Sequence, residues 1–165
     1  MRRKSLADLP DFEVPDGLAV RTFRVGDEAG WATLMTGAIG IWDEESTVRL
    51  FLGDAGVTPE GVFLLVAGDH YVATATDKQL PKSEVGYLHM VTVAPTYRGQ
   101  GLGRCISLAA LLHMKERGCR EAILDTDDLR LPAIRTYLSL GFMPEMLETD
   151  HTDRWAAIAA ELDSA

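Results

Sequence analysis

The sequence predicts an α/β (α+β) fold in which helices flank a mixed central sheet of about six strands. Two observations support this prediction. In the first half of the chain, two runs of β-branched and aromatic residues, 62–67 and 71–76, flank the turn Gly68-Asp69-His70 and indicate a β-hairpin. In the second half, strand-like and helix-like segments alternate, which is typical of a βαβ unit with parallel strands.

The predicted elements follow the order βααβββαβα(β), with a further helix at the C-terminus. Strands are predicted where apolar and polar residues alternate, and helices where apolar residues recur with a 3.6-residue period. Capping residues such as Asp27 mark helix starts. In chain order the predictions are an extended lead-in (1–17), a strand (18–23), two helices (28–40 and 44–52), the hairpin, a long strand (84–93), a long helix (about 105–115), a strand (121–126), a helix ending before Gly141, a strand beginning at Phe142, and an amphipathic helix (155–162).

Length and composition narrow the class of protein. A chain of 165 residues with 47% hydrophobic and 25% charged residues predicts one globular domain, residues 1–165. The net charge of −9 argues against nucleic acid and anionic membranes as partners, and mildly favours a cationic substrate such as an amine. No signal peptide and no metal-ligand spacing stand out, so we expect a cytoplasmic protein without a metal site. The two cysteines, Cys105 and Cys119, are expected to be free thiols.

A glycine-rich turn, Arg98-Gly99-Gln100-Gly101-Leu102-Gly103, joins the long strand to the long helix. Such a turn presents backbone N–H groups at the positive end of a helix dipole, which suits a phosphate or pyrophosphate. The turn lacks the Lys-Ser/Thr ending of a P-loop, and its spacing differs from the Gly-x-Gly-x-x-Gly fingerprint of dinucleotide-binding folds. It matches Arg/Gln-x-x-Gly-x-Gly/Ala through Arg98, Gly101 and Gly103.

This last pattern resembles the acyl-CoA-binding motif of the GNAT superfamily of N-acyltransferases, and residues 93–97 are similar to the family's lead-in. A second segment, 133–142, resembles the family's later motif Ala-x-x-x-Tyr-x-x-x-Gly-Phe. Two motifs in the correct order and spacing are far more specific than either alone. The resemblance covers residues 84–145, the expected cofactor-binding core.

The resemblance implies that acetyl-CoA is the co-substrate and indicates how it is held. The last residues of the long strand would pair with the pantetheine arm, and a bulge in that strand would open a slot beside Leu124. An amide near Val91 would polarise the thioester carbonyl. Amides of the glycine turn would hold the pyrophosphate, and arginines would supply local positive charge. The predicted cofactor-binding residues are Val91, Thr92, Val93, Arg98, Gly99, Gln100, Gly101, Leu102, Gly103, Arg104 and Arg130.

The resemblance also implies an acid and a base. Tyr137 matches the family tyrosine that protonates the CoA thiolate, although a packed aromatic would show the same pattern. His89 is the candidate base. It precedes Arg98 by the same distance at which arylalkylamine N-acetyltransferases carry a histidine before their own arginine, and imidazole titrates near neutral pH. A structural strand histidine is an equal alternative. Glu84 is a second candidate base, and a water relay is a third.

The sequence departs from the family pattern in two places. Arg130 stands where many relatives have an asparagine that caps the following helix, so Asp127 or Asp128 is expected to supply the cap. Arg130 is then expected to meet a CoA phosphate or to face solvent. The predicted C-terminal helix also replaces the further strand with which family members usually end.

The resemblance to this family implies an N-acetyltransferase that moves an acetyl group from acetyl-CoA to a primary amine of a small molecule or amino-acid-like substrate by direct attack. The alternatives are a non-catalytic acyl-CoA-binding or sensor module, and a protein N-terminal or lysine acetyltransferase. Trp31 and Met35 are candidates for either pocket or core, and residues 42–45 are the best substrate-facing segment. A homodimer is possible.

Overall fold

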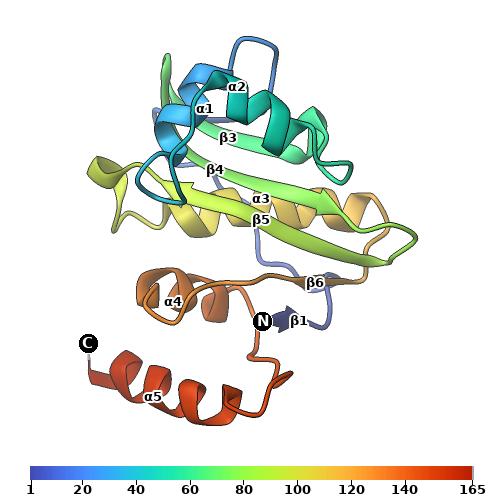
Figure 1. Ribbon diagram of the computed structural model, residues 1–165, viewed down its shortest axis with the longest axis vertical. Helices are drawn as coiled ribbons and strands as arrows, with labels where there is room; N and C mark the ends of the chain where they lie inside the picture. Colours follow the sequence, from blue (N-terminus) through green and yellow to red (C-terminus); the bar gives the residue numbers. More distant parts are fainter. Residues whose placement is uncertain (165) are drawn as a thin grey trace.

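A six-stranded mixed sheet, in the order β1-β6-β5-β4-β3-β2, forms the centre of the computed structural model, which describes residues 1–164 (Figure 1). Neighbouring strands are antiparallel except β5 and β6, which are parallel. This confirms the predicted fold class. The strands are β1 (Arg2–Arg3), β2 (Ala19–Thr22), β3 (Val62–Ala67), β4 (His70–Gln79), β5 (Val85–Val93) and β6 (Glu121–Ile123). The helices are α1 (Glu28–Met35), α2 (Glu44–Ser46), α3 (Leu102–Glu116), α4 (Leu131–Ser139) and α5 (His151–Ser164), with a π-helical turn η1 (Thr47–Leu52) and short 3-10 turns η2 (Pro59–Gly61) and η3 (Pro95–Tyr97).

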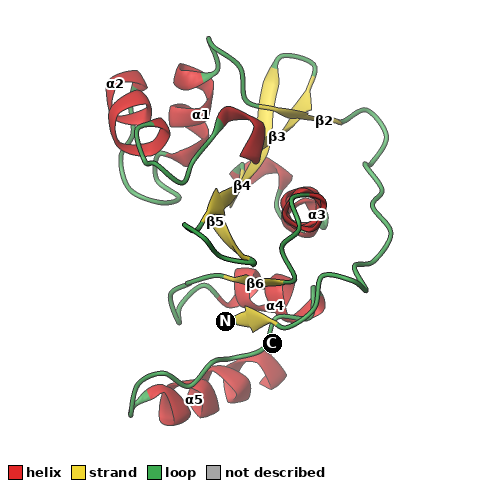
Figure 2. Ribbon diagram, turned by 90° about the vertical axis from the view of Figure 1, so that its right-hand side faces the viewer, coloured by secondary structure: helices red, strands yellow, loops and turns green. Residues whose placement is uncertain are grey.

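Helices cover both faces of the sheet. Figure 2 shows α1 and α2 on one face and α3 on the other, with α5 beyond the β1 edge. Helix α4 contacts α3. The larger apolar cluster lies between the sheet and α3, and its fully buried members include Ile106 and Met114. The smaller cluster lies under α1, where the ring of Trp31 stacks on Phe51 at a centroid distance of 4.1 Å. Trp31 and Met35 are fully buried there, so they belong to the core.

The two ends of the chain differ from the prediction. Residues 2–3 form β1, which pairs antiparallel with β6, although the sequence predicted only an extended lead-in there. The predicted strand at Phe142 is wrong, because only Met143 makes a bridge, to Arg2. The short N-terminal strand therefore takes the sheet edge next to β6. The predicted C-terminal helix is confirmed and is longer than expected.

Most internal elements agree with the prediction, and their ends follow local signals. The hairpin of β3 and β4 is present, and α4 ends in a Schellman motif at Gly141, whose φ is 79°. In that motif the amide of Phe142 donates to the carbonyl of Tyr137 at 3.0 Å. Helix α1 stops at Met35, short of the predicted Gly40, and the short helix α2 continues as the π-helical turn η1.

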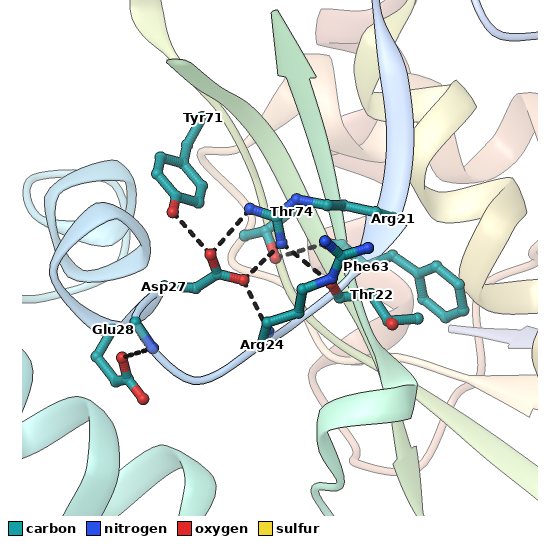
Figure 3. A network of polar contacts seen from close by, with 9 residues as sticks. Arg21, Thr22, Arg24, Asp27, Glu28, Phe63, Tyr71 and Thr74 are labelled. Atoms are coloured by element: carbon teal, nitrogen blue, oxygen red, sulfur yellow. Dashed lines mark hydrogen bonds and ion pairs between the residues drawn. The ribbon is translucent and has the colours of Figure 1, made fainter. Parts of the chain in front are cut away.

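Asp27 anchors the start of α1 to the sheet. Arg21 of β2 and Tyr71 of β4 both bond to its carboxylate, Tyr71 at 2.8 Å, and the amide of Arg24 donates to it at 2.7 Å (Figure 3). Burial alone would raise the pKa of Asp27, but these hydrogen bonds together hold it below its usual range. The network fixes α1 above β4, and so sets the position of the loop that follows α1.

Cys105 and Cys119 are both buried free thiols, as expected. Across residues 1–164, the structure contains no helix with the length and apolar character needed to cross a membrane.

Candidate active site

A β-bulge in β5 shapes the candidate site. Met90 and Val91 of β5 together oppose Ala75 of β4, because the pairing register shifts between Thr74 and Thr76. The backbone of Met90 is left-handed, with φ at 49°, a conformation that costs free energy for a residue with a side chain. The predicted bulge is therefore confirmed, and it bends β5 where the strand leads towards the glycine turn.

Beyond the point where β6 ends, β5 has a free edge. The two strands pair over three residues that end at Tyr87 and Ile123. On that side, residues 88–93 have no partner strand in the described part of the chain. Unpaired backbone groups on a strand edge can receive an added extended chain. The last three residues of β5, which were assigned to the pantetheine arm, lie on this edge.

The glycine turn places unpaired amides at the start of α3. Gly99 and Gly101 have left-handed backbones, with φ at 78° and 76°, and Gly101 is the N-cap of the helix. The amides of residues 99–101 donate to no other protein group within residues 1–164. Leu102 and Gly103 occupy the first helical positions, whose N–H groups have no partner inside a helix. These amides form a binding site for an anion at the positive end of the dipole.

Two of the three predicted arginines lie at this turn. Arg98 donates from Nε to the carbonyl of Val93 at 3.2 Å and lines a cavity of about 540 Å³ between α1 and the β3–β4 hairpin. Arg104 lies in the first turn of α3 and is half-buried. Both side chains can therefore offset the net negative charge of the chain locally, where an anionic cofactor would bind.

Arg130 connects two loops. Its Nη2 donates to the carbonyl of Ala38 at 3.0 Å, and its Nε lies 2.9 Å from a carboxylate oxygen of Asp127. The expected capping role of Asp127 or Asp128 is wrong, because Arg130 itself is the N-cap of α4 and no side chain bonds there. Asp128 instead pairs with Arg154. The contact between Arg130 and a CoA phosphate stays a prediction.

Tyr137 projects from α4 into the core cluster behind the sheet. Its side chain is buried, and its ring lies edge-on to Phe142 at a centroid distance of 6.2 Å. Burial raises the pKa of its phenol to about 12, although the charge of Arg130 opposes this effect. The phenol therefore keeps its proton at neutral pH, as a general acid must before it reacts.

His89 lies on β5 just before the bulge and is half-buried. Burial and then the charge of Lys78 lower its pKa, while the carboxylates of Asp54 and Asp125 oppose this effect. The imidazole is therefore neutral at physiological pH and can accept a proton. Glu84, the other candidate base, is exposed and pairs with Arg120 at the start of β5.

The structure adds a pair that the sequence analysis did not identify. The hydroxyl of Tyr87 donates to Asp125 at 3.0 Å, and its ring lies 5.3 Å from the ring of His89. Burial first, and then the bond to Asp125, raise the pKa of Tyr87 to about 12. The spacing of Tyr87 and His89, two residues apart on a strand, could have placed them on one face. Nothing in the sequence linked Asp125 to them.

The substrate-facing role expected for residues 42–45 is not supported at its aromatic end. The indole of Trp42 donates to the carbonyl of Ile39 and packs edge-on against Trp31 at 5.2 Å. Asp43 caps α2 through a capping box with Ser46. These two side chains stabilise the loop. All three carboxylates of residues 43–45 are exposed, but only those of residues 44 and 45 have no hydrogen-bond partner within residues 1–164.

A bulged strand with a free edge that leads into an amide-lined helix start is the arrangement expected from the resemblance to acyl-CoA-dependent acyltransferases. Sequence comparison agrees, because the acetyltransferase (GNAT) family matches residues 29–142. The chain belongs to this family.

Individual relatives agree with the assignment. A mycothiol acetyltransferase from Thermobispora bispora is 34% identical over 154 residues, covering 86% of this chain and 52% of the relative. The chain thus spans about half the length of the curated relatives it matches. A GCN5-related N-acetyltransferase from Sphaerobacter thermophilus has a TM-score of 0.65 and 26% identity over 87% of this chain and 47% of its own. A ribosomal-protein-S18-alanine N-acetyltransferase from Escherichia coli has the same TM-score at 20% identity, over 78% and 79% of the two chains, and shows the shared fold.

Proposed function

We propose that this protein transfers the acetyl group of acetyl-CoA to a primary amine of a small molecule by direct attack. The observation that carries the proposal is the continuous path from the free edge of β5 to the amides at the start of α3. An extended pantetheine arm fits the edge, and a pyrophosphate fits the amides. The mycothiol acetyltransferases among the relatives support a small-molecule acceptor rather than a protein.

The residues can divide the chemistry as follows. A neutral amine attacks the thioester carbonyl, whose oxygen gains charge beside an amide near Val91. Breaking the carbon–sulfur bond then releases the CoA thiolate, which takes a proton from Tyr137. His89, directly or through water, takes a proton from the incoming amine. These roles for Tyr137, His89 and the predicted cofactor-binding residues are part of the proposal.

The cofactor turn can be tested by titrating acetyl-CoA into the wild type and Gly101→Glu by calorimetry. A side chain at the left-handed Gly101 strains the backbone by roughly 1–2 kcal/mol. A carboxylate there also repels the pyrophosphate. We expect binding to weaken on the order of 100-fold.

Gly118→Glu is the matched control. Gly118 follows the other end of α3, also has a left-handed backbone with φ at 91°, and has no atom within 4 Å of the position a Cβ would take. This variant carries the same charge and the same kind of strain, so we expect it to keep acetyl-CoA affinity. Absence of binding by the wild type, or equal loss in both variants, would count against the proposed function.

The pH dependence tests the base. Protonated His89 cannot accept a proton, so the rate should fall as pH drops through its pKa. Because burial lowers that pKa, the fall should lie below the ordinary value of about 6.5. With an amine that supports CoA release, we expect His89→Gln to reduce kcat about 100-fold and to abolish this acid limb. An unchanged pH profile in the variant would assign the base to another group or to water.

A further inference from the structure

A second cavity adjoins the candidate site at the end of β6. It has a volume of about 230 Å³ and lies between the segment that follows β6, α4 and α5. Its lining is mostly polar, with one large aromatic ring, and includes Asp125, Thr126, Asp128, Glu145, Arg154 and Trp155.

Only some of the carboxylates that line this cavity are held in ion pairs. Asp128 is paired with Arg154 through two hydrogen bonds of 2.8 and 2.9 Å. Glu145 is paired with Arg2 at 2.7 Å. Asp125 is the remaining carboxylate, and within residues 1–164 no cationic group lies in ion-pair distance of it. The cavity therefore presents one carboxylate, exposed on its wall, that no ion pair holds.

Met1 also lines the cavity, but its amino group forms no ion pair with Asp125. It donates to the carbonyl of Leu124 at 2.8 Å instead of to a carboxylate. Arg154 and Arg2 balance Asp128 and Glu145, so Asp125 is the one lining carboxylate without an ion pair in the described residues; His151 also lines the cavity. A carboxylate without an ion pair and an indole ring in the wall of the same partly enclosed cavity favour a cationic group.

Asp125 also connects the cavity to the base. Its carboxylate receives the hydroxyl of Tyr87 at 3.0 Å, and the ring of Tyr87 lies against His89 at 5.3 Å. Asp125 is close enough for its charge to raise the pKa of His89 against the larger effect of burial. An acceptor whose amine is at His89 would therefore have its other end near Asp125.

On the basis of the proposed function, we propose that the acceptor is a primary amine with a second cationic group, which binds in this cavity against Asp125. One amino group would be neutral beside His89 and the thioester. The other would stay charged and would fix the orientation of the substrate. Asp125 is thus a specificity-determining residue, and Tyr87 is a positioning residue that holds its carboxylate at the rim of the site.

The test is calorimetric titration of the CoA-bound protein with three series of ligands, each with chains of three to six carbons: α,ω-diamines, linear monoamines and amino alcohols. We expect at least one diamine to bind about 10-fold or more tightly than the monoamine and amino alcohol of the same length. Asp125→Asn should remove that preference and leave CoA affinity unchanged. Asp153→Asn is the matched control, because Asp153 is exposed on α5 outside the cavity and its loss changes the net charge equally.

The outcomes separate the two proposals. Equal affinity for diamines and monoamines, or a diamine preference that survives in Asp125→Asn, would overturn the inference while CoA binding leaves the proposed function intact. Amino alcohols that bind as tightly as diamines would also overturn it, because the cavity would then recognise a hydroxyl group. A wild-type protein that binds neither CoA nor acetyl-CoA would overturn the proposed function itself. Thermal unfolding of each variant separates loss of affinity from loss of folding.

Discussion

Replacement of Tyr137 by phenylalanine is expected to lower the rate of acetyl transfer by about 10²–10⁴-fold, the range for loss of a positioned general acid. The CoA thiolate would then have to leave without a proton or take one from water. The measurement is the steady-state release of CoA with an amine acceptor. Affinity for acetyl-CoA, measured by calorimetry, should change little, because the proposed contacts of the cofactor are with β5 and the glycine turn.

The substitution is suitable because it removes one atom from a packed site. The ring of Tyr137 is buried among core residues and lies edge-on to Phe142, and phenylalanine keeps both contacts. The hydroxyl makes no hydrogen bond to another group in the part of the chain that the structure describes. We therefore expect the midpoint of thermal unfolding to stay within a few degrees of the wild type. A variant that unfolds much earlier would point to a structural role instead.

The direction of the pKa shift adds a second test. The pKa of Tyr137 is raised to about 12, so the phenol is neutral and can donate its proton at every pH below that value. Loss of activity between pH 8 and 10 would therefore come from another group. If Tyr137→Phe keeps full activity, the acid role belongs elsewhere. If wild type and variant both bind acetyl-CoA without turnover on any amine, a non-catalytic binding module is favoured.

The parts of the fold that the sequence predicted are those with local signals. Alternating residues around Gly68-Asp69-His70 mark the hairpin, and Gly141 marks the end of α4 because its left-handed backbone suits glycine. Strand β1 has no such signal, because arginine has little preference for strands. Its pairing depends on Arg2 reaching Glu121 and Glu145, residues more than a hundred positions away in the sequence.

The same distinction applies to the site. The glycine turn and Tyr137 are parts of contiguous motifs, so their positions could be predicted. The contact between Tyr87 and Asp125 joins residues 38 positions apart, and it depends on how β5 and β6 separate after their short pairing. Spacing along the chain cannot predict that separation. Trp31 shows the opposite case, since hydrophobicity alone could not distinguish a pocket wall from the fully buried core position it occupies.

The second large effect is on stability, and we expect it from Asp77→Asn. Asp77 lies on β4 with a fully buried side chain. Arg117, at the end of α3, holds its carboxylate through two hydrogen bonds of 2.8 Å, and Nδ1 of His113 lies 2.8 Å from it. This cluster ties the C-terminal end of α3 to the sheet, whereas the N-terminal end of the helix forms the cofactor turn.

Asparagine has nearly the same shape as aspartate, but it lacks the charge and turns one acceptor into a donor. An N–H group would then face the guanidinium of Arg117 in a buried position. Removal of one partner from a buried ion pair costs about 3–5 kcal/mol. The Arg117 side chain is 26% exposed and can regain some hydration, so we expect about 3 kcal/mol, or a fall of about 6–12 °C in Tm for a chain of this size. Urea denaturation measures the loss directly.

Glu84→Gln provides the comparison, because Glu84 and Arg120 form an ion pair whose side chains are 66% and 78% exposed. An exposed pair contributes about 0–1 kcal/mol, so this variant should unfold almost as the wild type does. If Asp77→Asn cost no more than Glu84→Gln, the buried cluster would not hold α3 to the sheet. In the double variant Asp77→Asn with Arg117→Met, the loss should be smaller than the sum of the two single losses by about 1–3 kcal/mol, because the second change removes the charge that the first leaves unpaired.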